Sequence, residues 1–134
     1  QPVSDAVVTS VDFFPTILSL VGIEGMPAQH VDGMNFVGPL LGHQDYQRGP
    51  VYWHYPHYYH TTKPVSAIRQ GDWKLLEFLE DNHVELYNLK EDVGEKNNMK
   101  KANPEKAKEL LHLLTEWRQQ VDASMPRLNP EYSK

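Results

Sequence analysis

Apolar residues between positions 10 and 21 recur at intervals of three or four, which predicts an amphipathic helix over this stretch. Its apolar face carries Val11, Phe14, Ile17, Leu18 and Val21. Thr9, Ser10 or Asp12 can cap the first turn. Gly22 suits the C-cap position that follows the last turn. Asp12 is therefore interpreted as a helix-capping acid and not as a catalytic acid.

A long irregular connection is predicted over residues 23–50, which are rich in Gly, Pro, Asn, Asp and Gln. One helical turn is expected near residues 38–42. The connection holds only scattered apolar residues, so the helix at 10–21 is expected to have few partners within the chain.

Four segments in the middle of the chain are rich in β-branched and aromatic residues, as is typical of strands. They are residues 51–54, 65–69, 73–79 and 84–89. Gly71 can adopt the positive φ of a tight hairpin, and Asp81-Asn82 supplies a second turn. The pattern predicts a small antiparallel sheet of three or four strands.

A second helix is predicted to begin at Asn103, with Pro104 in the first helical position and Glu105 in the first turn. Its apolar stripe consists of Ala107, Leu110, Leu111, Leu114, Trp117 and Val121. A helix with one apolar stripe is expected to cover one face of the sheet. The predicted fold class is therefore α+β, with the sheet packed against this C-terminal helix.

Composition and charge exclude several classes of protein. The chain has 134 residues, with 13 Lys and Arg against 18 Asp and Glu, a net charge of -5, and no basic block. We therefore expect no binding to nucleic acid. No apolar run reaches the ~20 residues of a spanning helix, so no membrane segment is expected. The chain begins at Gln1 without an initiator Met, and we expect a fragment or a processed product.

The densest group of functional side chains is the aromatic segment Trp53–His60, in which His54, His57 and His60 recur every third residue. A metal site is disfavoured, because Pro56 prevents a regular helix and a strand places residues three apart on opposite faces. Two interpretations stay open. The segment is either an ordinary aromatic loop or a binding platform for a sugar or an anion.

No set of residues in the chain forms a complete catalytic motif. With no Cys it offers no thiolate nucleophile, and it has no Gly-rich phosphate loop, no Gly-x-Ser-x-Gly elbow and no His-Glu-x-x-His motif. The acidic residues Glu77, Glu80, Asp81 and Glu85 are interpreted as solvated surface charge.

Six short motifs together resemble the C-terminal part of formylglycine-dependent sulfatases, in order and in spacing. They are residues 11–18 (VDFFPTIL), 21–23 (VGI), 32–36 (DGMNF), 67–75 (AIRQGDWKL), 85–89 (ELYNL) and 92–98 (DVGEKNN). The resemblance extends from about Val3 to Tyr132. It implies that residues 1–50 are the end of an α/β catalytic domain of the alkaline-phosphatase type, with its crossover, and that residues 51–134 are the C-terminal subdomain.

The resemblance also implies which chemistry lies outside this chain. Such sulfatases use a formylglycine made from a Cys/Ser-x-Pro-x-Arg motif, together with a calcium ion held by Asp and Asn. Neither group can be matched to residues here, so we expect no catalytic residue and no metal site in this chain, and no activity from it alone. The expected partner is the missing N-terminal catalytic domain.

For this part of the enzyme, the resemblance implies contacts with a sulfated sugar at the rim of the pocket, by His54, His57, Tyr58 and His60. It further implies export to the periplasm or the cell surface. Two alternatives stay open: a stand-alone carbohydrate-binding module and a protein-interaction module. An uncovered apolar face on the helix at 10–21 would favour the enzyme part, and a fully covered helix beside an open aromatic groove would favour the binding module.

Overall fold

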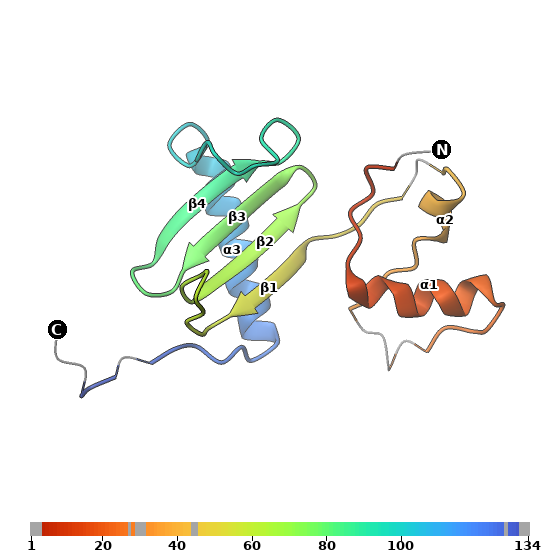
Figure 1. The fold of residues 1–134 in the computed structure, drawn as a ribbon, viewed down its shortest axis with the longest axis horizontal. Coiled ribbons are helices and arrows are strands. Elements are labelled where there is room, and N and C mark those ends of the chain that lie inside the picture. Colours follow the sequence, from red (N-terminus) through yellow and green to blue (C-terminus); the bar gives the residue numbers. More distant parts are fainter. Residues whose placement is uncertain (1–3, 27, 29–31, 44–45, 128, 132–134) are drawn as a thin grey trace. The chain divides into compact units, whose positions relative to one another are not determined.

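The structure is a computed structural model that describes residues 4–26, 28, 32–43, 46–127 and 129–131. The chain divides into two compact units, Gln1–Gly49 and Pro50–Lys134 (Figure 1). Each unit has its own secondary-structure elements.

The first unit is built around a short helix. A 3₁₀ turn, η1 (Ser10–Asp12), leads into α1 (Phe13–Leu20), and a single turn, α2 (Val37–Leu40), follows the long connection. These elements confirm the helix predicted over 10–21 and the helical turn expected near 38–42. Gly22 follows α1 with a φ of 71°, the left-handed conformation that a C-cap glycine provides.

Asp12 joins three parts of the first unit and is fully buried. Its carboxylate accepts hydrogen bonds from the backbone N–H groups of Thr9 (2.7 Å) and Met34 (2.8 Å) and from Arg48 Nη1 (2.6 Å). Burial alone would raise the pKa of Asp12, but these hydrogen bonds and the charge of Arg48 lower it. The hydrogen bond from Thr9 N–H confirms the predicted capping role of Asp12. The hydrogen bonds from Met34 and Arg48 join the long connection to η1.

The side of α1 that packs within the chain is not its apolar face. Pro15 and Thr16 are its buried residues, and the Thr16 hydroxyl accepts a hydrogen bond from Phe36 N–H at 3.1 Å. The large apolar residues of η1, α1 and the following turn are exposed: Val11, Phe13, Phe14, Ile17, Leu20 and Val21. Phe13 makes only an edge contact with Phe36, at 5.4 Å between ring centroids.

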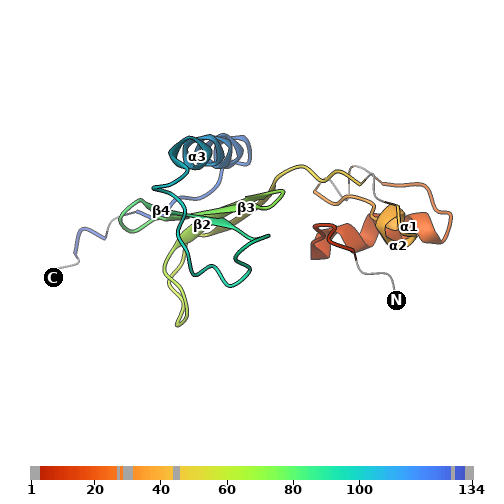
Figure 2. The ribbon, with the colours of Figure 1, turned by 90° about the horizontal axis from the view of Figure 1, so that it is seen from above.

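The second unit is a four-stranded antiparallel meander with one helix on one face. Its strands, in the order β1-β2-β3-β4, are β1 (Val51–Tyr55), β2 (Val65–Gln70), β3 (Trp73–Phe78) and β4 (His83–Asn88), followed by α3 (Pro104–Gln120). Figure 2 shows α3 lying along one side of the sheet. The predicted α+β fold is therefore confirmed, with four strands in the sheet.

The core of the second unit lies between the sheet and α3. It consists of Ile68, Leu75, Val84, Leu86, Ala107, Leu110 and Leu114. At its edge Trp117 stacks on Tyr52, with 4.8 Å between ring centroids and 3° between planes. The turns are as predicted, since Gly71 and Asn82 both have a φ of 57°.

Asn103 occupies the predicted N-cap position of α3, although its side chain makes no capping hydrogen bond. One detail of the predicted α3 is wrong. Val121 was placed on the apolar stripe, but the helix ends at Gln120 and Val121 is 52% exposed. The backbone turns after the helix, at Asp122 with a φ of 50°, so Val121 lies beyond the last regular turn of the stripe.

Candidate functional site

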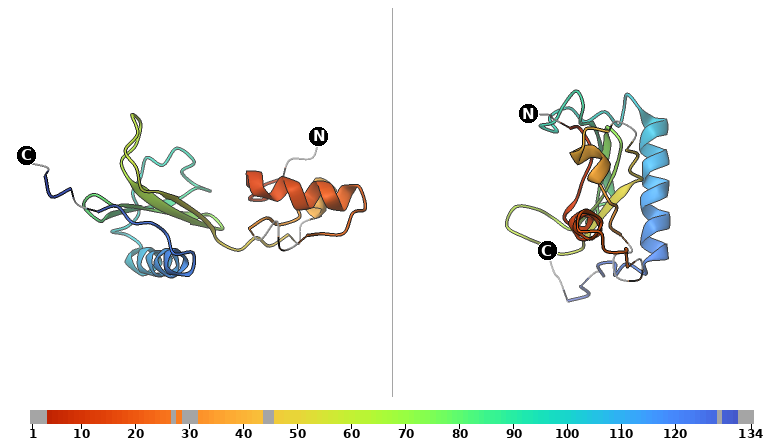
Figure 3. Two further views of the ribbon diagram at one scale, coloured as in Figure 1. Left: turned by 90° about the horizontal axis from the view of Figure 1, so that it is seen from below. Right: turned by 90° about the vertical axis from the view of Figure 1, so that its right-hand side faces the viewer.

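The loop between β1 and β2 carries three of the four predicted substrate-binding residues: His57, Tyr58 and His60. At its tip, the backbone groups of Tyr59 and Thr62 exchange two hydrogen bonds of 3.0 and 3.2 Å. At its base, Pro64 O accepts a hydrogen bond of 2.8 Å from Leu79 N–H. The loop extends away from the sheet on the side opposite α3 (Figure 3). We call residues 56–64 the aromatic hairpin.

Rings of the aromatic hairpin pack on one another around Tyr55, the last residue of β1. Tyr55 makes edge contacts with His57 (5.7 Å) and Tyr59 (6.5 Å), measured between ring centroids. Tyr59 in turn contacts His60 at 4.0 Å. The structure therefore brings His57 and His60 into one exposed cluster, from which imidazole nitrogens can bind hydroxyl or anionic oxygens.

Tyr58 lies in the same loop and is 69% exposed. Close to it, Lys63 forms an ion pair of 2.6 Å with Glu80 in the turn between β3 and β4. The hydrogen bond and charge of Glu80 raise the pKa of Lys63, and those of Lys63 lower the pKa of Glu80. This exposed pair joins the hairpin to the neighbouring turn.

His54 is separated from the other three predicted residues. It lies on the α3 side of β1, where its Nδ1 is 2.7 Å from Ser66 Oγ and its Nε2 is 2.8 Å from Ser124 O. The hairpin residues extend to the opposite side of the sheet. The three-residue spacing of the histidines therefore does not place them in one cluster, because β1 ends between His54 and His57.

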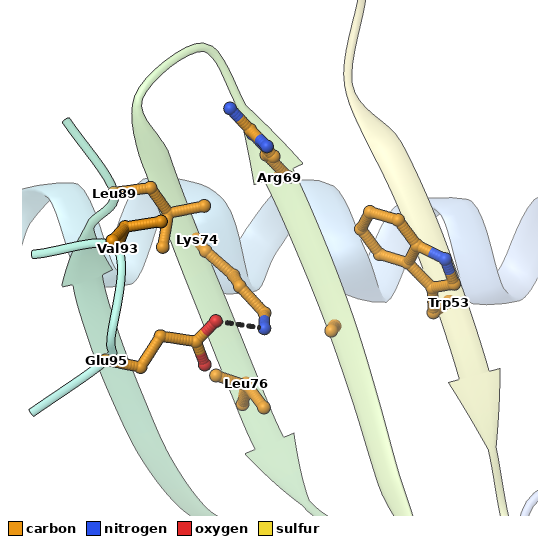
Figure 4. A pocket seen from close by; sticks show the side chains of 8 residues that line it. Trp53, Arg69, Lys74, Leu76, Leu89, Val93 and Glu95 are labelled. Carbon is orange, nitrogen blue, oxygen red and sulfur yellow. Dashed lines mark hydrogen bonds and ion pairs between the residues drawn. The ribbon is translucent and has the colours of Figure 1, made fainter. Parts of the chain in front are cut away.

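An open hollow of about 450 Å³ lies on the face of the sheet that α3 does not cover (Figure 4). Its lining consists of Trp53, Ala67, Arg69, Lys74, Leu76, Leu89, Val93 and Glu95. Lys74 Nζ forms an ion pair of 2.6 Å with Glu95, which lies in the loop after β4. Trp53, on β1, is 45% exposed on the other side of the hollow from this pair.

This hollow was not predicted from the sequence, although the strands carry a signal for it. In an antiparallel sheet with one solvated face, apolar and polar residues alternate. Here Trp53, Ala67 and Leu76 are apolar although they alternate with the core-facing residues of their strands. A second apolar face of this kind is typical of a sheet that is covered on both sides.

The described residues contain no group of three His, Cys, Asp or Glu side chains placed to hold a metal ion. None of the six serines of the sequence lies in a Ser-x-Pro-x-Arg context, and the sequence has no Cys. The described residues therefore do not fit a calcium site, and the sequence offers no motif for a formylglycine. Within the described ranges, no helix is long and apolar enough to cross a membrane.

Comparison with known proteins matches nearly the whole chain to sulfatases. A family model described as N-sulphoglucosamine sulphohydrolase, C-terminal, matches residues 1–122. An N-acetylglucosamine-6-O-sulfatase of Bacteroides thetaiotaomicron is 34% identical over 134 residues, covering 92% of this chain and 23% of that protein. A delta 4,5-hexuronate-2-O-sulfatase of the same organism is 32% identical over 126 residues, with 92% and 24% covered.

Solved structures share the fold as well. A 2-O GAG sulfatase superposes with a TM-score of 0.67 at 28% identity, over 84% of this chain and 25% of that chain. A protein in complex with its substrate D-glucosamine-2-N,6-O-disulfate has a TM-score of 0.54 at 30% identity, over 86% and 24%.

The fold and these matches define the C-terminal domain of a sulfatase, which confirms the resemblance found in the sequence. The chain belongs to the N-sulphoglucosamine sulphohydrolase C-terminal family. It spans about a quarter of the length of the sulfatases that it matches.

Proposed function

We propose that this chain is the C-terminal part of a longer sulfatase that hydrolyses sulfate esters of carbohydrates. The observation that carries the proposal is the uncovered apolar face of α1. A helix is stabilised by burying its apolar residues, yet Phe13, Ile17 and Leu20, which share one side of α1, are all more than half exposed. The matched sulfatases are about four times as long, and their additional chain could cover such a face.

The two units have different roles in this proposal. The first unit, up to about residue 50, is the end of the catalytic domain and its crossover, and the second is the C-terminal subdomain. The partner of α1 is the N-terminal catalytic domain, which would supply the formylglycine, the calcium ion and the residues that act on the sulfate. The whole enzyme would work in the periplasm or at the cell surface.

The second unit contributes contacts with the sugar at the rim of the pocket, through His57, Tyr58 and His60. Imidazole nitrogens can bind sugar hydroxyls or sulfate oxygens, and tyrosine faces can stack on the C–H surface of a sugar ring. The relatives are named for sulfated glucosamine and hexuronate, and one structure holds a disulfated glucosamine. We therefore propose a sulfated glycosaminoglycan fragment as the substrate class.

A stand-alone carbohydrate-binding module is less well supported. Such a module needs a complete apolar core, and the exposed residues of α1 leave the first unit without one. An interaction module would use the same face of α1 to associate with itself, without any affinity for a sugar.

A sulfate-release assay tests the proposal. This chain and the longer gene product that contains it are compared on an aryl sulfate and on sulfated glucosamine and galactosamine oligosaccharides. We expect release by the longer product alone. Release by these 134 residues, or none by the longer product on any substrate, would contradict the proposal.

A further inference from the structure

A network of polar side chains lies between the sheet and α3, with Ser66 at its centre. Ser66 is fully buried, and its Oγ lies 2.7 Å from His54 Nδ1 and 3.3 Å from Arg118 Nη1. Arg118, on α3, also forms an ion pair of 2.6 Å with Glu77 on β3. The other nitrogen of His54 reaches Ser124 O, in the segment after α3. One set of contacts thus joins three strands, the helix and the segment that follows it.

The polar network around Ser66 lies at the end of the sheet that carries the aromatic hairpin. His54 is paired with Ser66, and the next pair, Tyr55 with Val65, is the last one before the aromatic hairpin. Glu77 is the partner of Ser66 on the other side, in β3. The polar network therefore lies directly at the base of the aromatic hairpin.

The chemistry of the side chains assigns the hydrogen-bond donors and acceptors of this polar network. A guanidinium can only donate, so Arg118 donates to Ser66 Oγ. A carbonyl oxygen can only accept, so His54 Nε2 carries a proton and donates to Ser124 O. When Nδ1 carries no proton, Ser66 donates its own proton to it. Both ring nitrogens of His54 are thus used within the protein.

We propose that His54 is a positioning residue for substrate recognition: it fixes the base of the aromatic hairpin against α3 and does not itself bind the sugar. This inference rests on the proposed function, since it concerns how His57, Tyr58 and His60 are presented to the substrate. It assigns to His54 a different role from the sugar contact that its neighbours in sequence are proposed to make.

A variant of Ser66 distinguishes positioning by His54 from direct binding of the sugar by His54. It is fully buried, so a substrate cannot touch it. If His54 acts by positioning, Ser66→Ala should have the same effect as His54→Ala, and the double variant should add nothing further. If His54 binds the sugar directly, only the variants of His54 should affect binding.

The first measurement uses this chain alone and needs no activity. Hydrogen exchange is followed at the amides of Tyr59 and Thr62, which bond across the tip of the hairpin. His54→Ala and Ser66→Ala should each speed this exchange about tenfold, as expected for the loss of one buried hydrogen bond. The amide of Leu75, in the core strand β3, should not change, and Ser19→Ala on the exposed side of α1 is the matched control.

The second measurement uses the longer gene product with a sulfated disaccharide and an aryl sulfate. Both single variants and the double variant should raise KM for the disaccharide by the same factor, about tenfold. KM for the aryl sulfate, which has no sugar hydroxyls, should change less than twofold.

Two conservative variants provide a rescue test that also applies if Ser66→Ala does not fold. An Asn amide oxygen can take the place of Nδ1 and keep the bond from Ser66, and a Gln amide nitrogen can take the place of Nε2 and keep the bond to Ser124. His54→Asn and His54→Gln should therefore each restore part of the exchange protection that His54→Ala loses.

Unchanged exchange at Tyr59 and Thr62 in every variant, or a raised KM with His54→Ala but not with Ser66→Ala, would overturn the inference. Absence of sulfate release from the longer product would instead overturn the proposed function. The exchange measurement would still decide the role of His54 in that case.

Discussion

The two main helices of this chain differ in what their apolar residues contact. Leu110 and Leu114 of α3 are completely buried against the sheet, whereas Leu20 of α1 is 57% exposed. Both helices have apolar residues at helical spacing, but only α3 has a sheet within its own unit to cover them. The second unit contains its own core, whereas large apolar residues of the first unit stay exposed in the part of the chain that the structure describes.

The largest effect should come from the core of the second unit. Leu110→Ala removes a fully buried side chain from between α3 and the sheet. We expect a loss of about 2–5 kcal/mol in the free energy of unfolding, from lost burial and the cavity left behind. All three tryptophans lie in this unit, so their fluorescence during urea unfolding measures its stability. A loss below about 1 kcal/mol would show that α3 does not depend on this contact.

A loss in the lower half of that range is expected when the buried charge pair of the first unit is broken. Asp12→Asn leaves Arg48 buried, with a side-chain exposure of 8%, and without its anionic partner. The expected cost is about 3 kcal/mol, limited to the first unit. NMR resonances of residues 9–41 should show it, and those of the second unit should stay unchanged.

The pKa of Asp12 gives this pair a defined dependence on pH. Because the folded state lowers that pKa below its usual value of 3.8, the carboxylate stabilises the first unit above about pH 4. The stabilisation should be lost as the pH falls through the lowered value. In an acid titration followed by NMR, Asp12→Asn should lack this transition. An identical transition in the variant would assign it to another carboxylate.

Substitutions in the aromatic hairpin should affect the choice of substrate and not the stability of the second unit. His57→Ala in the longer gene product should lower kcat/KM for a sulfated disaccharide about tenfold, the equivalent of one hydrogen bond of ~1.4 kcal/mol. Turnover of an aryl sulfate should change less. His112→Ala, on the exposed side of α3, is the matched control. Equal losses on both substrates would indicate a structural role for His57.

The smallest effect in this chain should come from Leu20→Ala, the same substitution as Leu110→Ala on the other helix. Since the side chain of Leu20 is mostly exposed, the free energy of unfolding should change by no more than about 0.5 kcal/mol. Hydrogen exchange of the α1 amides measures this change. A loss comparable to that of Leu110→Ala would mean that α1 is already packed within these 134 residues.

Most of the fold could be predicted because local pattern determines it. The strands, their turns and both helices follow from periodicity and from residues such as Gly71 and Pro104. The features that sequence pattern could not predict depend on contacts between distant residues. His54 is bonded to Ser66, 12 residues away, and to Ser124, 70 residues away. No spacing within the aromatic segment could indicate either bond.

The hollow on the open face of the sheet shows the same limit. Trp53 and Glu95 are brought to one surface by the order of the strands and by the loop after β4. Each residue alone is unremarkable in the sequence. The role of Asp12 was likewise predicted only in part, since its cap to Thr9 is local and its bonds to Met34 and Arg48 span the connection.

The most direct test of this account is the accessibility of the apolar face of α1. The sequence has no Cys, so Leu20→Cys introduces a single thiol into this part of the protein, and Glu116→Cys on the exposed side of α3 is its control. The rate of thiol modification is measured by peptide mass spectrometry in this chain and in the longer gene product. We expect both positions to react in this chain, and only position 116 to react in the longer protein. Rapid reaction at position 20 in the longer protein would contradict the account.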